Sequence, residues 1–167
     1  MFGICVGMQM LAKSSEEGNL PGLVWLNAEV KVFNNYVDNY ELLIPHMGWN
    51  NITPRKENRL LVGFSNSSYF YFLHSYYFEA YDDTNIVSTT KYGNHFVSTI
   101  NKENIYGVQF HPEVVHSLHG KELLSNFLFD ISGCEPNWTP ANFVADAIQA
   151  IKDKVGDKKV ICGLPVR

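Results

Sequence analysis

Two short segments, far apart in the chain, carry residue types suited to nucleophilic catalysis. In the first, Gly3-Ile4-Cys5-Val6-Gly7, a cysteine stands between two glycines, after a short apolar lead. The second is His111-Pro112-Glu113. A thiolate can attack a carbonyl carbon after an imidazole takes the thiol proton, and a nearby carboxylate can orient and charge-stabilise that imidazole. We therefore predict that Cys5, His111 and Glu113 form a catalytic triad.

The glycines around Cys5 are typical of a nucleophile elbow, a strained turn between a strand and a helix, where flanking side chains would clash. The following helix, expected over residues 8–13, would point its N–H groups and its positive dipole end at the sulfur. We therefore expect the pKa of the Cys5 thiol to be lowered. Cys134, in a loop, and Cys162, in an apolar strand, are expected to be less reactive. The alternative is that Cys5 is an inert buried thiol, as most single cysteines are.

The composition favours one globular domain. The chain has 167 residues, of which 46% are hydrophobic and 14% aromatic, enough for a substantial core. A net charge of -4 without a basic cluster argues against nucleic acid and anionic membranes as partners. Three irregularly spaced cysteines form neither a disulfide framework nor a metal motif. We expect a cytoplasmic protein with no signal peptide, membrane span, metal or cofactor.

The hydrophobic pattern indicates mixed α and β structure. Strands are expected at residues 28–33, 69–73 (a well-buried aromatic run), 85–90 paired with 95–100, and 105–110, and helices at 120–131 and 142–155. Active sites in open α/β sheets gather at the carboxyl ends of strands. Cys5 and His111 each follow a strand, so we expect both at one edge of the sheet.

Together with Gln9, these residues resemble the class I (triad) glutamine amidotransferases, which carry Gly-x-Cys-x-Gly-x-Gln and His-Pro-Glu. The resemblance implies a flavodoxin-like α/β glutaminase domain with a mixed sheet. It implies that Cys5 attacks the side-chain amide of L-glutamine, giving ammonia and a thioester that is hydrolysed to glutamate. It also implies that four residues belong to the substrate site: Gln9, Val6, Ser75 and Tyr76. Of these, Val6 would act through its backbone N–H, which would donate to the oxyanion. Without the resemblance, Gln9 is equally well an ordinary exposed residue of the first helical turn.

Residues 3–113 resemble the glutaminase subunit of imidazole glycerol phosphate synthase, from histidine biosynthesis. The matching segments are 14–18, 45–50 and 72–77. Segment 45–50 implies that His46, Trp49 and Asn50 dock a (β/α)₈-barrel synthase partner in a heterodimer. Ammonia would pass between the two subunits at this surface, and Tyr71 would lie near that passage. A tryptophan beside a turn glycine makes a good interface anchor, although Trp49 could instead cap a local core. On spacing alone, His46 and His74 are more readily structural than catalytic.

Residues 114–164 resemble GMP synthetase, in which this stretch leads from the glutaminase domain into an ATP-pyrophosphatase domain. The phosphate-binding glycines of that domain are absent here, so we expect no ATP site. The predicted division is a glutamine amidotransferase domain over 1–133 and a linker with the start of a pyrophosphatase-like domain over 134–167, including a short helical extension.

The elbow lies almost at the first residue, so the resemblance predicts a domain truncated at both ends. The strands and the glycine-rich loop that precede the nucleophile in the family would be missing, which would expose apolar edges and remove one partner of the aromatic strand 69–73.

Three functions follow from these observations. The leading one is glutamine hydrolysis with ammonia passed to the barrel synthase. The alternatives are the glutaminase part of GMP synthetase, feeding adenylylated xanthosine monophosphate, and an inactive fragment that serves only as an interaction module. Segment 45–50 favours the first, because the GMP synthetase subfamily has no use for that docking sequence.

Overall fold

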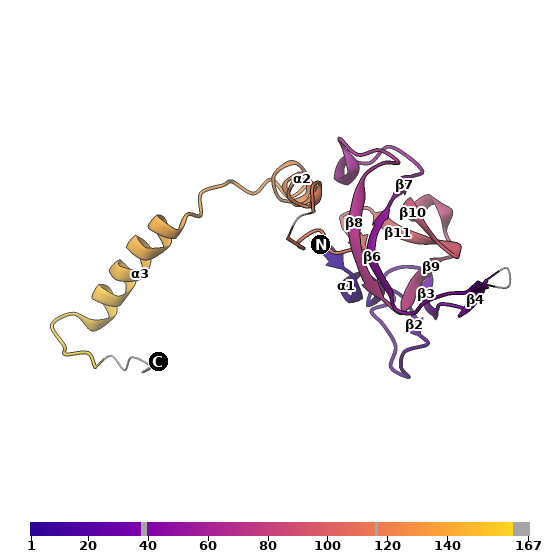
Figure 1. Cartoon of the computed structure of the whole chain (residues 1–167). Helices are drawn as coiled ribbons and strands as arrows, with labels where there is room; N and C mark the ends of the chain where they lie inside the picture. The colour runs from indigo at the N-terminus through magenta and orange to yellow at the C-terminus, as the bar shows by residue number, and fades with distance from the viewer. Residues whose placement is uncertain (38–39, 116, 162–167) are drawn as a thin grey trace. The chain divides into compact units, whose positions relative to one another are not determined.

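The computed structural model describes residues 1–37, 40–115 and 117–161. The chain divides into two compact units, Met1–Cys134 and Glu135–Arg167, and each is described by itself. All the predicted catalytic residues belong to the first unit, and Figure 1 labels most of its strands and helices.

The first unit is built on a mixed sheet with the strand order β1-β12-β11-β9-β3-β2, with β10 pairing β11 and β7. Its strands are β1 (Phe2–Ile4), β2 (Ser14–Ser15), β3 (Ala28–Val32), β7 (Thr53–Pro54), β9 (Tyr76–Ala80), β10 (Ile86–Tyr92), β11 (Asn94–Lys102) and β12 (Ile105–Val108). The β1–β12 and β2–β3 pairs are parallel and the others are antiparallel. The predicted α/β class with a mixed sheet is confirmed. Strands β4 (Tyr36–Val37) and β5 (Tyr40–Glu41) form a small separate pair.

A second ribbon is formed by β6 (His46–Asn51) and β8 (Tyr69–His74), which run antiparallel and side by side (Figure 1). Alternation divides β8 into two faces: Phe70 and Phe72 are buried, whereas Tyr69 and Leu73 are exposed. The strand that was expected to be well buried is therefore buried on one face only, and it pairs with β6. Segment 45–50 is also a strand where a turn was expected. Gly48 has φ 136° within it, a conformation that favours glycine.

Helix α1 (Val6–Gln9) begins two residues before the predicted helix over 8–13 and ends four residues before its predicted end. The backbone carbonyls beyond it accept bonds from a returning loop, in which the Leu23 N–H donates to Met10 and the Trp25 N–H donates to Leu11. These contacts replace the bonds that would have continued the helix. Residues Ser14–Ser15 form β2 beside β3.

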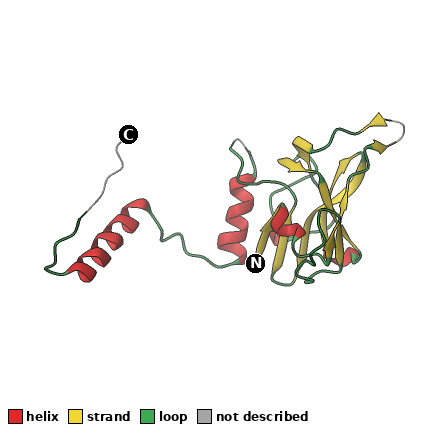
Figure 2. Ribbon diagram, turned by 90° about the horizontal axis from the view of Figure 1, so that it is seen from below, coloured by secondary structure: helices red, strands yellow, loops and turns green. Residues whose placement is uncertain are grey.

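Most of the other predicted elements are confirmed within a few residues. The strands at 28–33, 86–92, 94–102 and 105–108 match, and the helix at 120–131 consists of α2 (Gly120–Ser125) and a π-helical segment, η3 (Asn126–Ile131), drawn as one coil in Figure 2. Short 3₁₀ helices lie at η1 (Arg59–Leu61) and η2 (Asp83–Asn85). The strand expected around Cys162 lies outside the described residues.

The second unit contains α3 (Pro140–Val155). Thr139 caps it, since its side-chain oxygen accepts a hydrogen bond from the Asn142 N–H at 3.1 Å, and Pro140 opens the first turn. Among the described helices, none is long and apolar enough to cross a membrane.

Two apolar clusters stabilise the first unit. One contains Phe70, Phe72 and Phe110, together with Leu123 of α2. The other contains Met8 of α1, Val30 and Phe78. A stacked pair at 4.1 Å between the rings of Phe70 and Phe110 joins the β6–β8 ribbon to the segment that follows β12. This packing holds the ribbon across the sheet edge where β1 and β12 end.

Two buried histidines, His46 of β6 and His74 of β8, face each other inside the first cluster. The Nδ1 atom of His46 lies 3.0 Å from Nε2 of His74. The ring of His46 stacks on Tyr92 at 3.9 Å and on Phe72 at 4.8 Å. Burial lowers the pKa of His46 to about 3, with a contribution from His74, and burial lowers the pKa of His74 to about 4. Both rings are therefore neutral at pH 7.

This pair predicts acid sensitivity. The folded pKa values lie below the ordinary 6.5, so the unfolded chain binds more protons, and stability falls as the pH drops from about 6.5 to about 4. Each extra proton bound by the unfolded chain contributes about 1.4 kcal/mol per pH unit to the slope. His46→Phe should reduce that slope by about one proton while keeping the ring stack. Urea denaturation at a series of pH values measures it, and an unchanged slope would contradict neutral burial of His46.

Candidate active site

Cys5 stands at a strained turn between β1 and α1. Its backbone has φ 51° and ψ -111°, a conformation rare for a residue with a side chain. A Cβ on Gly3 would lie 2.6 Å from the backbone carbonyl of Gly7, so the first glycine is required. Nothing lies within 4 Å of a Cβ built on Gly7 itself. The predicted elbow is confirmed, with its steric requirement at Gly3 alone.

The parallel pairing of β1 with β12 brings Cys5 and His111 to one edge of the sheet. The Cys5 N–H donates to the Val108 carbonyl at 2.8 Å, and His111 follows β12 three residues later. Strand β8 crosses this edge: the His111 N–H donates to the Tyr71 carbonyl at 2.8 Å, and the Cys5 thiol donates to the Leu73 carbonyl at 3.8 Å. Two residues of strand span about 7 Å, so the nucleophile and the histidine are close neighbours along β8.

His111 and Glu113 form a hydrogen-bonded pair. The Nδ1–H of His111 donates to Oε1 of Glu113 at 2.8 Å. A carboxylate only accepts, so this bond fixes the imidazole tautomer and leaves the lone pair on Nε2. That nitrogen is the one a general base needs.

The imidazole does not hold the thiol in this structure. Among the described residues, the sulfur of Cys5 has two hydrogen-bond partners: the Leu73 carbonyl and the Gln109 amide at 3.7 Å. The structure thus brings the three predicted catalytic residues to one sheet edge, with the thiol turned towards β8. A shift of the thiol towards Nε2 of His111 would complete a triad.

Burial raises the pKa of the Cys5 thiol above its ordinary value of 9.0. The Val6 N–H and the Gln109 amide lower it, whereas the negative charges of Glu113 and Glu17 raise it further. The predicted lowering is therefore wrong. Helix α1 has only four residues, so its dipole is too small to offset desolvation of the thiolate.

A pocket of about 360 Å³ opens beside Cys5. It is lined by Cys5, Val6, Gln9, Glu17, Pro45, Leu73, His74, Ser75 and Tyr76, which include all four predicted substrate-site residues. Its volume lies in the range of small-molecule sites. Gln9 is not an ordinary exposed helix residue, because its Nε2 donates to the Tyr76 carbonyl at 2.9 Å and to Oε1 of Gln109 at 3.1 Å.

Sequence reasoning did not place five residues at this site: Glu17, Pro45, Leu73, His74 and Gln109. Gln109 offered one signal, because it is a polar residue in an otherwise apolar strand segment two positions before His111. Glu17 and Leu73 offered none. Glu17 belongs to a polar turn, and Leu73 contributes a backbone carbonyl, which any residue type could supply.

The structure separates the four predicted docking residues. Trp49 is 47% exposed, so the alternative that it caps a local core is wrong, and its ring lies 5.6 Å from that of Tyr71. Asn50 and Tyr71 are half-buried. His46 is only 3% exposed, so its predicted docking role is also wrong. Even residues of β6 point into the core and odd ones point outwards, which the family segment alone did not reveal.

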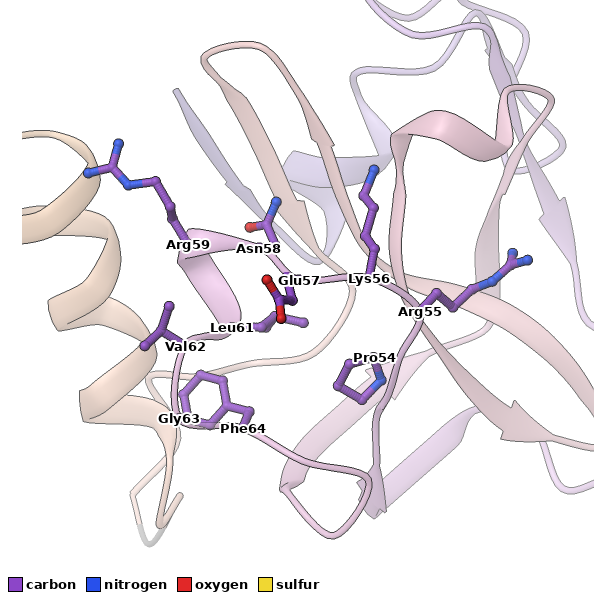
Figure 3. A pocket seen from close by; sticks show the side chains of 10 residues that line it. All are labelled: Pro54, Arg55, Lys56, Glu57, Asn58, Arg59, Leu61, Val62, Gly63 and Phe64. Carbon is purple, nitrogen blue, oxygen red and sulfur yellow. The ribbon is translucent and has the colours of Figure 1, made fainter.

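A larger hollow of about 710 Å³ lies elsewhere in the first unit, along the single segment 54–64. Figure 3 shows its cationic side chains spread along the rim. Each has a partner: Arg55 pairs with Asp83, Lys56 donates to the Thr84 carbonyl, and Arg59 donates to the Asp130 carbonyl. With its charges engaged and no nucleophile in its lining, this hollow is a weaker candidate than the Cys5 pocket.

A family model described as glutamine amidotransferase class-I matches residues 1–131. The chain belongs to the class I glutamine amidotransferase family. Within this family, the imidazole glycerol phosphate synthase subunit HisH of Leptospira borgpetersenii is 47% identical over 127 residues, 76% of this chain and 62% of the relative. The subunit HisH 2 of Methanococcus maripaludis is 47% identical over 128 residues, 77% of this chain and 61% of the relative. The chain spans about three fifths of these relatives' length.

Two solved structures share the fold. A Thermoplasma acidophilum protein, described provisionally as part of a GMP synthase, superimposes with a TM-score of 0.58 at 20% identity, over 89% of this chain and 60% of that one. A glutamine amidotransferase from Thermotoga maritima gives a TM-score of 0.50 at 18% identity, over 92% and 56%. The predicted family and fold are confirmed.

The environment of Cys5 predicts slow alkylation at neutral pH. In a Cys134→Ser, Cys162→Ser background, the iodoacetamide rate should keep rising above pH 9, because the thiol pKa is raised. Glu113→Gln removes a negative charge that raises this pKa, so it should accelerate alkylation at pH 8. Mass mapping after timed labelling gives the rates. A plateau below pH 8, or slower labelling of Glu113→Gln, would contradict these electrostatics.

Proposed function

We propose that this chain hydrolyses L-glutamine to glutamate and ammonia, and that the ammonia passes to a barrel synthase of the imidazole glycerol phosphate type in histidine biosynthesis. The observation that carries the proposal is a cysteine on a strained elbow beside a small-molecule pocket, with a His111–Glu113 pair at the same sheet edge. The similarity to HisH chains supports the pathway.

In the proposed reaction, Nε2 of His111 takes the thiol proton as the sulfur of Cys5 attacks the side-chain carbonyl carbon of glutamine. The backbone N–H of Val6 donates to the oxyanion, as expected for the residue after an elbow nucleophile. The imidazolium returns its proton to the departing nitrogen, which leaves as ammonia, and a thioester remains. His111 then deprotonates a water that attacks the thioester, releasing glutamate and the thiol.

The pocket lining supports glutamine as the substrate. Glu17 supplies a carboxylate to attract the α-ammonium group, and Gln9, Ser75 and Tyr76 supply polar atoms. A small pocket with a few convergent polar groups suits an amino acid. The raised pKa and the turned thiol fit a resting state that becomes active only after a small rearrangement.

The outer face of the β6–β8 ribbon supports docking of the synthase. Met47, Trp49 and Leu73 are exposed there, and the half-buried Tyr71 packs against Trp49. Exposed apolar side chains grouped on one face are typical of an interaction surface. The same strand contributes the Leu73 carbonyl that holds the Cys5 thiol. We propose that docking on this face moves β8 and thereby releases the nucleophile.

Ammonia release from glutamine, measured with the barrel synthase present, tests the chemistry. His111→Ala should lower it by about 10²- to 10⁴-fold, because the base is lost. Glu113→Gln should lower ammonia release less. The loss in the double variant, His111→Ala with Glu113→Gln, should be far smaller than the product of the two single losses. His95→Ala, an exposed histidine on β11, is the control and should turn over normally. Unimpaired His111→Ala would overturn the assignment, and an inactive wild type would overturn the proposed function.

Trp49→Ala tests the docking surface. Because Trp49 is 47% exposed, its truncation should leave the melting temperature nearly unchanged. Affinity for the barrel synthase should fall by about 2 kcal/mol or more, the range for an aromatic anchor. Trp138→Ala, an exposed tryptophan of the second unit, is the matched control. Normal affinity in Trp49→Ala, or an equal loss in Trp138→Ala, would rule out an anchor role for Trp49.

A further inference from the structure

A line of hydrogen bonds begins at the half-buried Asn50 of β6 and enters the core through the two histidines. The Nδ2 atom of Asn50 lies 3.3 Å from Nε2 of His46 and donates to the Lys91 carbonyl at 3.0 Å. Nδ1 of His46 lies 3.0 Å from Nε2 of His74. Nδ1 of His74 lies 2.8 Å from the Tyr76 carbonyl.

The line continues from that carbonyl to the nucleophile through two glutamines. The Tyr76 carbonyl also accepts from Nε2 of Gln9 at 2.9 Å. Nε2 of Gln9 donates at 3.1 Å to Oε1 of Gln109. Nε2 of Gln109 then donates to the sulfur of Cys5 at 3.7 Å.

The Tyr76 carbonyl sets the direction of every bond, because a carbonyl can only accept. His74 must therefore carry its proton on Nδ1, which leaves Nε2 to accept from Nδ1–H of His46. Nε2 of His46 then accepts from Asn50. On the other side, Gln9 must present its amide N–H₂, so the oxygen of Gln109 accepts and its N–H₂ faces Cys5.

We propose that this hydrogen-bonded line positions the sulfur of Cys5 through Gln109 and links it mechanically to the docking strand β6. Gln109 and the histidine pair are thus positioning residues for the glutaminase reaction. The inference rests on the proposed function for the role of Cys5, and it adds residues that the triad does not include.

Burial makes this line hard to break. Gln109 is fully buried, and His46 and His74 are nearly so, so water cannot replace a lost partner. An unpaired buried polar group is costly, which favours movement of the linked groups together. His74 and Tyr76 also line the substrate pocket, so a shift of β6 reaches both the pocket wall and the nucleophile.

The test is the rate of Cys5 alkylation by iodoacetamide at pH 8.5, in the full chain with Cys134→Ser and Cys162→Ser. Gln109→Met keeps the side-chain length but loses the donor to sulfur, so thiolate and alkylation should fall about tenfold. A site that had merely loosened would react faster. Equal or faster alkylation of a folded Gln109→Met variant would overturn the proposal.

His46→Asn and His46→Leu form a matched pair, because the two new side chains have nearly the same shape. Asparagine can still donate to Nε2 of His74, whereas leucine cannot. We expect His46→Leu to be alkylated several-fold more slowly than His46→Asn. A loosened site reacts faster, so a purely structural role predicts that both variants are alkylated at least as fast as the chain that keeps His46, whereas the proposal places His46→Leu below that rate. Equal rates, or a faster leucine variant, would overturn the link to β6.

Gln9→Met covers the case in which His46→Leu does not fold, since Gln9 is only half-buried. It should also slow alkylation several-fold, because the Gln109 amide loses its anchor, and an unchanged rate would overturn the proposal. Alkylation needs no glutamine turnover. A chain without glutaminase activity that shows these rate differences would therefore support the hydrogen-bonded line and refute the proposed function. An active chain without these rate differences would support the proposed function and refute the line.

Discussion

The parallel pairing of β1 with β12 is the contact on which the rest of the site depends. Strand β1 has only three residues and pairs with β12 in the sheet. It ends directly before Cys5. Parallel neighbours end at the same edge, so this pairing alone brings Cys5 near His111 although 106 positions separate them in the sequence. The close approach of Gly3 to Gly7 then allows the chain to turn directly from strand to helix.

The chemistry of Cys5 depends on a balance between burial and hydrogen bonding. Burial and two nearby carboxylates oppose the thiolate, whereas the Val6 N–H and the Gln109 amide favour it. Burial is the largest of these effects, so the resting protein holds a thiol turned towards Leu73. Under the proposed function, a protected resting thiol would limit ammonia release until an acceptor is present. The carboxylate of Glu113 accepts a hydrogen bond from His111 and its negative charge also disfavours the Cys5 thiolate. One residue therefore affects both the imidazole and the thiol.

The β6–β8 ribbon connects surface and core because its two faces differ. Its outer face exposes Met47, Trp49 and Leu73, and its inner face buries Phe70 and Phe72 with the histidine pair. The polar groups on the buried side pair with one another, with backbone carbonyls and with the two glutamines beneath the pocket. Any partner that moved the outer face would therefore also move groups that line the pocket. The ribbon thus connects Trp49 and Tyr71 on its outer face to the Cys5 thiol through the residues between them.

The sequence by itself determined the family and most of the strands, and it pointed to Cys5 and the His-x-Glu pair as catalytic candidates, because these depend on residue types at short spacing and on hydrophobic alternation. It could not determine the pKa of Cys5, since desolvation depends on what packs around the sulfur and on how short α1 becomes. It could not distinguish buried His46 from exposed Trp49 within one short segment, because the inward face of β6 depends on its register with β8. Nor could it find Gln109 or Leu73 beside the sulfur. Those contacts join strands distant in the sequence, and only the tertiary structure decided them.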